Sequence, residues 1–343
     1  MAKKIFLSFA FALLLAIGGG LYYGYNQVFK GSTNPSAVPY ELYVRPGFTT
    51  DSVYQLLKAD EVFTNLELFT FIAEKKGLTQ VKSGHYTIAD GTSINGLVNA
   101  LKAGLQTPVK VHFNGAQDLR DIANQLSTQL MISSNDLYDA LAQPLGEGWT
   151  TETQKGAYLP DTYEFYWNAS GATVAQKIHE NWKRYWSPER VEKASALGLT
   201  PQEVGVVASI VMKESAKVDE RPQVARLYLN RIKKSMKLQA DPTVIYALKR
   251  NNPDMEVRRV LTRDLRIQDP YNTYVNLGLP PGPICVPERG ALDAVLKAPN
   301  HDYVFMCADP AKPGYHAFAK TYAKHLVNKA KWTAYLNNRR IYR

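Results

Sequence analysis

Cysteine and histidine are scarce in this chain, which contains two cysteines and six histidines among 343 residues. Cys285 and Cys307 cannot build the disulfide framework on which small secreted domains depend, and the sequence leaves open whether these two pair with each other. The histidines are scattered and form no group at metal-ligand spacing. We therefore expect neither a metal site nor a cofactor.

Common nucleophile, zinc and nucleotide motifs are also missing. The sequence contains no G-x-S-x-G, no H-E-x-x-H and no P-loop. The formal net charge is +10, but the basic residues are dispersed rather than gathered in a run. An excess of positive charge favours polyanionic partners such as acidic lipid headgroups or wall polymers. Because the basic residues are dispersed, nucleic acid is the least favoured of these partners.

The N-terminus holds a long stretch without charge. Residues 5–29 contain no charged side chain, and Lys3 and Lys4 precede them. This stretch has about the length of ~20 residues that a membrane-spanning helix needs, and the two lysines favour a cytoplasmic N-terminus. We expect residues 1–30 to form a cytoplasmic tip and an uncleaved single-pass anchor. A cleaved signal peptide is the alternative, although the small-x-small cleavage site is poor.

Three regions are expected after the anchor. Turn residues indicate a linker, periodic apolar residues indicate a small α+β region, and a second α+β domain with a cleft completes the chain. Their limits are 31–39 for the linker, 40–158 for the small region and 159–343 for the second domain.

The small region shows a weak internal repeat. Its periodicity predicts two strand–helix–helix–strand units, and the second closing strand is placed at residues 156–158 because Gly-Ala-Tyr there echoes Gly-His-Tyr at 84–86. Units of this kind are similar to LysM-type modules, which bind N-acetylated glycan chains. Generic α+β packing is the alternative.

The second domain is organised around residues 199–247. Thr200, Pro201 and Glu203 mark a helix start, with a hydroxyl N-cap, proline at the first helical position and an acid three residues after the cap. An apolar stripe follows at helical spacing, and Glu214 continues that stripe. Burial there would raise the pKa of the carboxyl group, so that Glu214 could act as a general acid near neutral pH. Alternatively, the helix emerges into solvent at Glu214.

With the other motifs absent, the sequence points to catalysis by carboxyl groups. Cleavage of a sugar bond needs an acid that protonates the leaving oxygen, and a hydrolase usually adds a second carboxylate. A lytic transglycosylase needs only one, because the C6 hydroxyl of the sugar attacks while one glutamate first gives and then takes a proton. Glu214 suits that role. Glu220 and Asp241 are possible second carboxylates, but pairing with a cation or support of the next helix N-terminus explains Glu220 better.

Several stretches in fixed order resemble the endolytic murein transglycosylases of the MltG (YceG-like) family. These stretches are ASIVMKES (208–215), ERPQVARLYLNRI (220–232), MKLQADPTVIYAL (236–248), YNTYVNLGLPPGPI (271–284) and GYHAFAKTYAKH (314–325). The resemblance implies that Glu214 is the catalytic acid and base. Two departures from the family pattern are Met212, where a second acid is usual, and Val-Pro-Glu at 286–288, where Asn-Pro-Gly is common.

Seven further residues of these stretches are candidate substrate contacts, because they offer amide, carboxylate, ring or imidazole groups to a glycan. They are Asn230, Gln239, Asp241, Tyr271, Asn272, Tyr274 and His316. Structural roles are the alternatives: internal hydrogen bonds for the amides, orientation of a loop for the histidine, and a helix cap for Asp241.

The function we expect is internal cleavage of nascent peptidoglycan strands at the MurNAc–GlcNAc β-1,4 bond, which leaves 1,6-anhydro-MurNAc ends. The enzyme would be held by its anchor in the bacterial cytoplasmic membrane, with the catalytic region on the extracytoplasmic side. The resemblance also suggests association with peptidoglycan synthases. A non-catalytic wall-binding scaffold and a two-carboxylate glycan hydrolase remain the alternatives.

Overall fold

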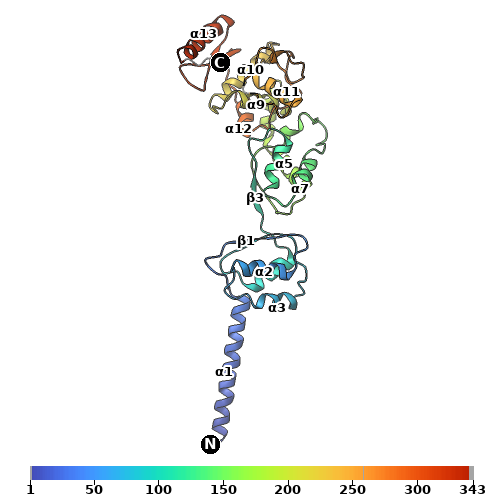
Figure 1. Cartoon of the computed structure of the whole chain (residues 1–343), viewed down its shortest axis with the longest axis vertical. Coiled ribbons are helices and arrows are strands. Elements are labelled where there is room, and N and C mark those ends of the chain that lie inside the picture. Colours follow the sequence, from blue (N-terminus) through green and yellow to red (C-terminus); the bar gives the residue numbers. More distant parts are fainter. Residues whose placement is uncertain (1, 258, 340–343) are drawn as a thin grey trace. The chain divides into compact units, whose positions relative to one another are not determined.

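Figure 1 shows the computed structural model of the chain, which describes residues 2–257 and 259–339, without the side chains of residues 2–12, 21 and 27. The fold is α+β, as expected, and the described strands form three two-stranded sheets. Two compact units make up the chain. The first contains residues up to 111 with 129–131 and 164–169, and the second contains 112–128, 132–163 and the chain from 170 onward.

The first unit has the predicted order strand, helix, helix, strand. Its elements are α1 (Ala2–Phe29), β1 (Tyr40–Val44), α2 (Thr50–Ala59), α3 (Leu68–Lys75), β2 (Gly84–Ile88) and α4 (Ile94–Ala103). β1 and β2 pair antiparallel, with Tyr40 opposite Ile88. Leu42 and Val44 alternate with exposed residues along β1 and enter a core that α2, α3 and α4 cover. The likeness to LysM modules stays a prediction.

Within the part of the chain that the structure describes, no single helix is both long and apolar enough to cross a membrane. One pair of helices, 188–196 and 201–214, passes by length and composition only when taken together across a 72° bend. The N-terminal anchor stays a prediction.

A second strand–helix–helix–strand order follows the first. Its elements are β3 (Val109–His112), α5 (Leu119–Ser127), α6 (Ser134–Leu141), the 3₁₀ helix η1 (Gln154–Ala157) and β4 (Thr162–Phe165), and β3 pairs with β4. The strand predicted at residues 156–158 is wrong, because the closing strand is β4. Gln154 Nε2 donates to the carbonyls of Leu141 and Gln143 and thereby fixes η1 as a turn instead.

The remaining elements build the second core. They are α7 (Gly171–Tyr185), α8 (Pro188–Ala196), α9 (Pro201–Glu214), α10 (Arg221–Lys233), α11 (Asp241–Asn251), η2 (Asp264–Arg266), α12 (Arg289–Leu296), β5 (Phe305–Ala308), β6 (His316–Ala319) and α13 (Tyr322–Asn338). Cys285 and Cys307 are free thiols, which answers the question that the sequence left open.

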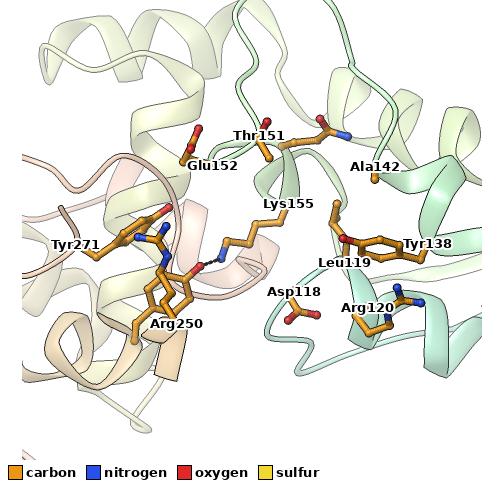
Figure 2. Close-up of a pocket in the computed structure, with 12 residues that line it drawn as sticks. Asp118, Leu119, Arg120, Tyr138, Ala142, Thr151, Glu152, Lys155, Arg250 and Tyr271 are labelled. Atoms are coloured by element: carbon orange, nitrogen blue, oxygen red, sulfur yellow. Dashed lines mark hydrogen bonds between the residues drawn. The ribbon is translucent and has the colours of Figure 1, made fainter. Parts of the chain in front are cut away.

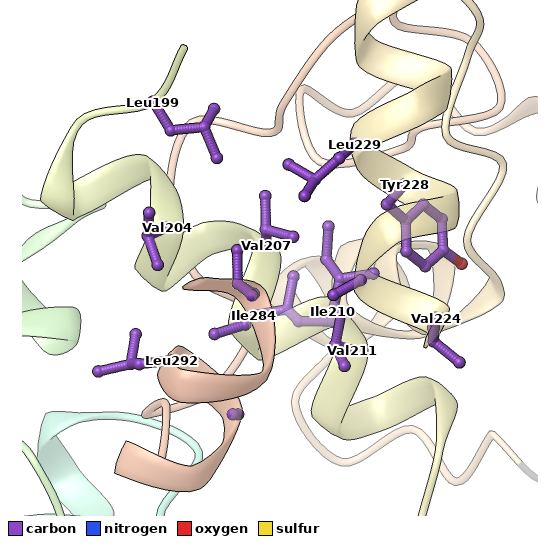
Figure 3. Packing of buried hydrophobic residues seen from close by; sticks show 14 of the residues in the cluster. Leu199, Val204, Val207, Ile210, Val211, Val224, Tyr228, Leu229, Ile284 and Leu292 are labelled. Atoms are coloured by element: carbon purple, nitrogen blue, oxygen red, sulfur yellow. The ribbon is translucent and has the colours of Figure 1, made fainter. Parts of the chain in front are cut away.

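Helix α9 is the centre of this core. Its N-terminus has the predicted capping box, in which Thr200 Oγ1 accepts from the Glu203 amide and Glu203 Oε2 accepts from the Thr200 amide. Residues 204–211 are all buried, so the helix is covered on every side rather than along one stripe. Figure 3 shows the cluster, with Val211 of α9, Val224 of α10 and Leu292 of α12. A rigid core thus holds the C-terminal residue of α9, Glu214.

Candidate active site

Glu214 stands where α9 leaves the core. The helix ends at this residue, and Ser215 turns the chain into extended conformation. The Glu214 side chain is partly buried. Its exposure is intermediate between the two alternatives that the sequence left open, full burial and emergence into solvent. A carboxyl group in this place is shielded by the core on one side while it remains within reach of a ligand on the other.

Tyr228 of α10 holds the carboxyl group of Glu214. Its hydroxyl donates to Glu214 Oε1 across 2.7 Å, and the tyrosine is itself only 2% exposed. Glu214 Oε2 makes no hydrogen bond with any residue that the structure describes. The arrangement fixes one carboxyl oxygen of this partly exposed residue and leaves the other without a hydrogen-bond partner among the described residues.

The pKa of Glu214 is raised from 4.5 to about 7. Burial is the largest cause, and the negative charge of Asp241 adds to it. The hydrogen bond from Tyr228 works in the opposite direction, because it stabilises the ionised carboxylate. A carboxyl group that titrates near pH 7 can both donate and accept a proton under physiological conditions, which is what a single acid–base residue requires.

Asp241 and Tyr274 form the neighbouring part of the site. The Tyr274 hydroxyl donates to Asp241 Oδ1 across 2.6 Å, and burial together with this carboxylate raises the pKa of Tyr274. Asp241 is the first residue of α11, whose N-cap is Ala240 without a side-chain hydrogen bond. The helix cap considered for Asp241 is therefore wrong, and its carboxylate faces Tyr274 instead.

Arg231 supplies buried positive charge beside these acids. Its Nε donates to the Val304 carbonyl across 2.7 Å and one Nη to the Leu238 carbonyl across 2.6 Å. Burial lowers the pKa of Arg231, while Tyr228 and Glu214 counteract that effect. Its guanidinium group is thus held by main-chain carbonyls rather than by either acid of the site.

Glu220 is fully engaged by protein donors. It is 5% exposed. Its Oε1 accepts from the His316 amide at 2.6 Å, while Oε2 accepts from the Ser215 hydroxyl at 2.9 Å and pairs with His316 Nδ1 at 2.8 Å. Glu220 is thus hydrogen-bonded to an imidazole, and no side-chain cap supports α10; the pairing with a cation stays a prediction. Because Ser215 follows Glu214 directly, Glu220 and His316 together fix the end of α9.

The other candidate contacts serve mainly as scaffold. Asn230 Nδ2 donates to the carbonyls of His301 and Tyr303. Asn272 is completely buried, and its Nδ2 donates to the carbonyls of Leu265 and Ile267, so this amide cannot face a ligand. Both residues thus have the internal hydrogen bonds that were the structural alternative.

Gln239 and Tyr271 differ from these amides. Gln239 is exposed with a positive φ of 49°, and its amide nitrogen donates to the Thr273 carbonyl. Tyr271 is buried against the Tyr246 ring at 4.7 Å between centroids. The loop that carries Tyr271 also contributes this ring to a cavity lined by Arg250 and Lys155 (Figure 2).

Comparison with known proteins shows which family the chain belongs to. The sequence model of the YceG-like family matches residues 42–331. The chain belongs to the YceG-like family. A protein of Bacillus subtilis called endolytic murein transglycosylase is 28% identical, over 92% of this chain and 90% of its own length. A protein of Streptococcus pneumoniae with the same name is 25% identical over 90% of this chain, which spans only 61% of that longer protein.

The fold of this YceG-like chain is also found in a solved structure. A crystal structure of a YceG-like protein from Listeria monocytogenes aligns with a TM-score of 0.54 and 23% identity. The alignment covers 83% of this chain and 97% of the other one. At this identity the likeness concerns the fold alone.

Sequence reasoning missed three residues of the site. The sequence alone singles out none of Tyr228, Ser215 and Arg231 as a site residue. Each is polar within an otherwise apolar or buried stretch, which was the available signal. Their partners, however, lie on other elements and could not be read from local spacing.

Proposed function

We propose that this protein is a membrane-anchored lytic transglycosylase that cuts peptidoglycan glycan strands internally. The bond broken is the β-1,4 bond between MurNAc and GlcNAc, and the product end is 1,6-anhydro-MurNAc. One observation carries the proposal: a partly buried glutamate with a pKa of about 7 whose Oε1 is held by Tyr228. The names of the relatives in Bacillus and Streptococcus support the same activity.

Glu214 performs both proton transfers in this mechanism. In its protonated form it donates to the glycosidic oxygen as the bond from that oxygen to C1 of MurNAc breaks. The C6 hydroxyl oxygen of the same sugar then bonds to C1, and its proton returns to the Glu214 carboxylate. The leaving GlcNAc keeps the first proton, so no water is consumed and the enzyme ends in its starting state.

The surroundings of Glu214 suit this cycle. Because burial raises the pKa of Glu214 to about 7, a substantial fraction of the enzyme carries the protonated carboxyl group at neutral pH when substrate arrives. The Tyr228 hydroxyl stabilises the carboxylate that forms after proton donation. Gln239, Asp241 and Tyr274 are the candidate contacts for the flanking sugars, since the buried amide of Asn272 is excluded.

Transglycosylation and hydrolysis differ in the oxygen that bonds to C1 of MurNAc at the new strand end. It comes from the C6 hydroxyl group of the sugar in the first reaction and from water in the second. Defined glycan strands are digested in oxygen-18 water, and the products are weighed by mass spectrometry. We expect ends that are lighter by one water and free of label. Oxygen-18 in the new reducing ends would refute the transglycosylase mechanism and favour the two-carboxylate hydrolase.

Glu214→Gln tests the residue itself. The amide cannot donate and recover the proton, so we expect a loss of cleavage of at least about a hundredfold with a normal fold. Glu192→Gln is the matched control, because Glu192 is exposed on α8 and we expect it to keep wild-type activity. Cleavage by Glu214→Gln at a rate near that of the wild type would defeat the assignment.

The hydrolase is the second candidate, and Asp241 is the observation that favours it. Its charge acts on Glu214, so two carboxylates share the site. Glu220 does not compete for that role, because both of its oxygens are already bonded. The wall-binding scaffold would be favoured by binding of glycan without turnover.

Anchoring and location are part of the same proposal. We place residues 1–30 in the bacterial cytoplasmic membrane and the catalytic region on its outer side, near peptidoglycan synthases. Fractionation of cells that express the full chain and a chain beginning at residue 31 tests this. Recovery of both forms in the soluble fraction would contradict the anchor.

A further inference from the structure

A cavity of about 330 Å³ lies apart from Glu214 in the second unit. Helices α5, α6 and α11, the turn η1 and the loop of Tyr271 line it (Figure 2). Neither Glu214 nor Tyr228, Asp241 or Tyr274 belongs to the lining. The cavity is therefore a separate feature of the surface, and nothing in the proposed reaction uses it.

Lys155 is the most unusual residue of the cavity. It is only 7% exposed, and its Nζ donates to the Tyr246 hydroxyl across 2.6 Å while lying 4.3 Å from the centre of that ring. Among the described residues no carboxylate lies within ion-pair distance of this Nζ. An ammonium group has three donors, so Lys155 retains hydrogen-bonding capacity that the protein does not use. Burial lowers its pKa to about 8.

Two arginines add positive charge to the same lining. The Arg250 guanidinium lies 4.8 Å from the Tyr271 ring centre, and its contacts with Asp269 are long, at 3.5 Å. Arg120 lies 3.7 Å over the Tyr138 ring. Aromatic faces hold these two cations in place, and Asp269 partly offsets the charge of Arg250. Such a preorganised set of donors suits an anionic group.

The charges that line the cavity indicate which kind of anion it binds. Three cations line the cavity together with the carboxylates of Asp118 and Glu152, and Asp269 lies 3.5 Å from Arg250, so no excess of positive charge remains. Without excess positive charge to offset it, the cost of desolvating a dianionic phosphate is greater than that of desolvating a monoanionic carboxylate, so the carboxylate is favoured. The volume is large enough for a small side chain or chain end.

We propose that this cavity binds a free carboxylate of the peptide carried by peptidoglycan strands, with Lys155 and Arg250 as the charged donors. The inference rests on the proposed function for the identity of the peptide. Helix α11 links the two places, since it begins at Asp241 beside Glu214 and carries Tyr246 and Arg250 to the cavity. At 1.5 Å per residue, Asp241 and Arg250 are roughly 14 Å apart along the helix, which a substituent on a bound strand can span.

Direct binding tests the cavity without relying on catalysis. Calorimetry with the full chain compares N-acetylmuramoyl-L-alanyl-D-glutamate, the same peptide with both carboxyl groups amidated, and inorganic phosphate. We expect the free acid to bind at least about tenfold more tightly than the amide, because a charge-assisted hydrogen bond is lost. Lys155→Met should abolish this difference. Lys249→Met, an exposed neighbour on α11 that does not line the cavity, should preserve it.

Cleavage gives the second readout. The ratio of kcat/KM for peptide-bearing strands to that for strands stripped of peptide should fall about tenfold in Lys155→Met and stay unchanged in Lys249→Met. Equal affinity for acid and amide, an unchanged difference in Lys155→Met, or tighter binding of phosphate would overturn the inference. Binding of the acid by a protein that cleaves no strand would instead refute the proposed function and leave the carboxylate site standing.

Discussion

Tyr228 of α10 donates its hydroxyl hydrogen to Oε1 of Glu214, the last residue of α9, across 2.7 Å. The bond joins two helices that belong to the same core, so the carboxyl group is positioned by the packing of that core. It also sets the acidity of Glu214, because it stabilises the ionised form and thereby opposes the effect of burial. Position and acidity of Glu214 can consequently be tested through one hydroxyl group.

Replacement of Tyr228 by phenylalanine should raise the pKa of Glu214 above 7. The alkaline limb of the pH–rate profile should move upward by about one unit, since a hydrogen bond to the charged form is removed. The maximal rate should drop about tenfold, because Oε1 is no longer held. Tyr185→Phe is the control, since the Tyr185 hydroxyl donates to Asp293 away from the site. A slower enzyme with an unmoved pH profile would mean that Tyr228 serves only packing.

Replacement of Asp241 by asparagine should move the same profile in the opposite direction. The negative charge of Asp241 raises the pKa of Glu214, so its removal stabilises the carboxylate and shifts the alkaline limb to lower pH. The measurement is kcat/KM from pH 5 to pH 9 for Asp241→Asn and for Tyr228→Phe. Shifts of the same sign in both variants would contradict the electrostatic account of the site.

Local signals were sufficient to predict the helix that bears Glu214. The Thr200 cap, Pro201 and Glu203 lie within four residues of one another, and the structure contains the predicted capping box. Glu214 stood out because a carboxylate continued an apolar pattern. These features depend on spacing along one helix, which a sequence displays directly.

The partners of Glu214 could not be predicted in the same way. Tyr228 fits the apolar face of α10 equally well as a core residue, and only the packing of α9 on α10 brings its hydroxyl to the carboxyl group. His316 is 96 residues from Glu220 in sequence, and the pairing of β6 with β5 sets its place. Such contacts belong to the tertiary structure.

Local similarity also misled the prediction. Gly-Ala-Tyr at 156–158 echoes a strand of the first unit, yet it forms part of the turn η1 and its exit. The side chain of Gln154 satisfies two main-chain carbonyls there, and the Tyr158 hydroxyl donates to the Leu141 carbonyl as well. Hydrogen bonds to a preceding helix outweighed a three-residue resemblance.

The pair of Glu220 and His316 should be strongly coupled in stability. His316→Gln leaves a 5% exposed carboxylate without its imidazole partner, so we expect a loss of about 2–4 kcal/mol in the free energy of unfolding. Glu220→Gln combined with His316→Gln should cost less than the two single changes added together, because no buried carboxylate is then left without its imidazole partner. Urea unfolding of the four proteins measures the coupling. Additive losses would show that the two side chains act independently.

Glu214 should make the fold less stable as pH rises. Its pKa is raised from 4.5 to about 7, so between these values the folded protein keeps a proton that the unfolded chain releases. The free energy of unfolding must then fall across this window and level off above it. The full shift would correspond to roughly 3 kcal/mol, and partial exposure reduces our expectation to about 1–2 kcal/mol.

Glu214→Gln removes this titration, which separates the stability effect from catalysis. The variant and the wild type should differ little near pH 4, and the variant should become more stable by about 1–2 kcal/mol at pH 8. Urea unfolding at four pH values from 4 to 8 measures the difference, with Glu192→Gln as the control that shows no such trend. A difference that does not change with pH would mean that Glu214 titrates like a solvated carboxylate. In that case the site would lack the proton that cleavage of the glycan strand needs at neutral pH.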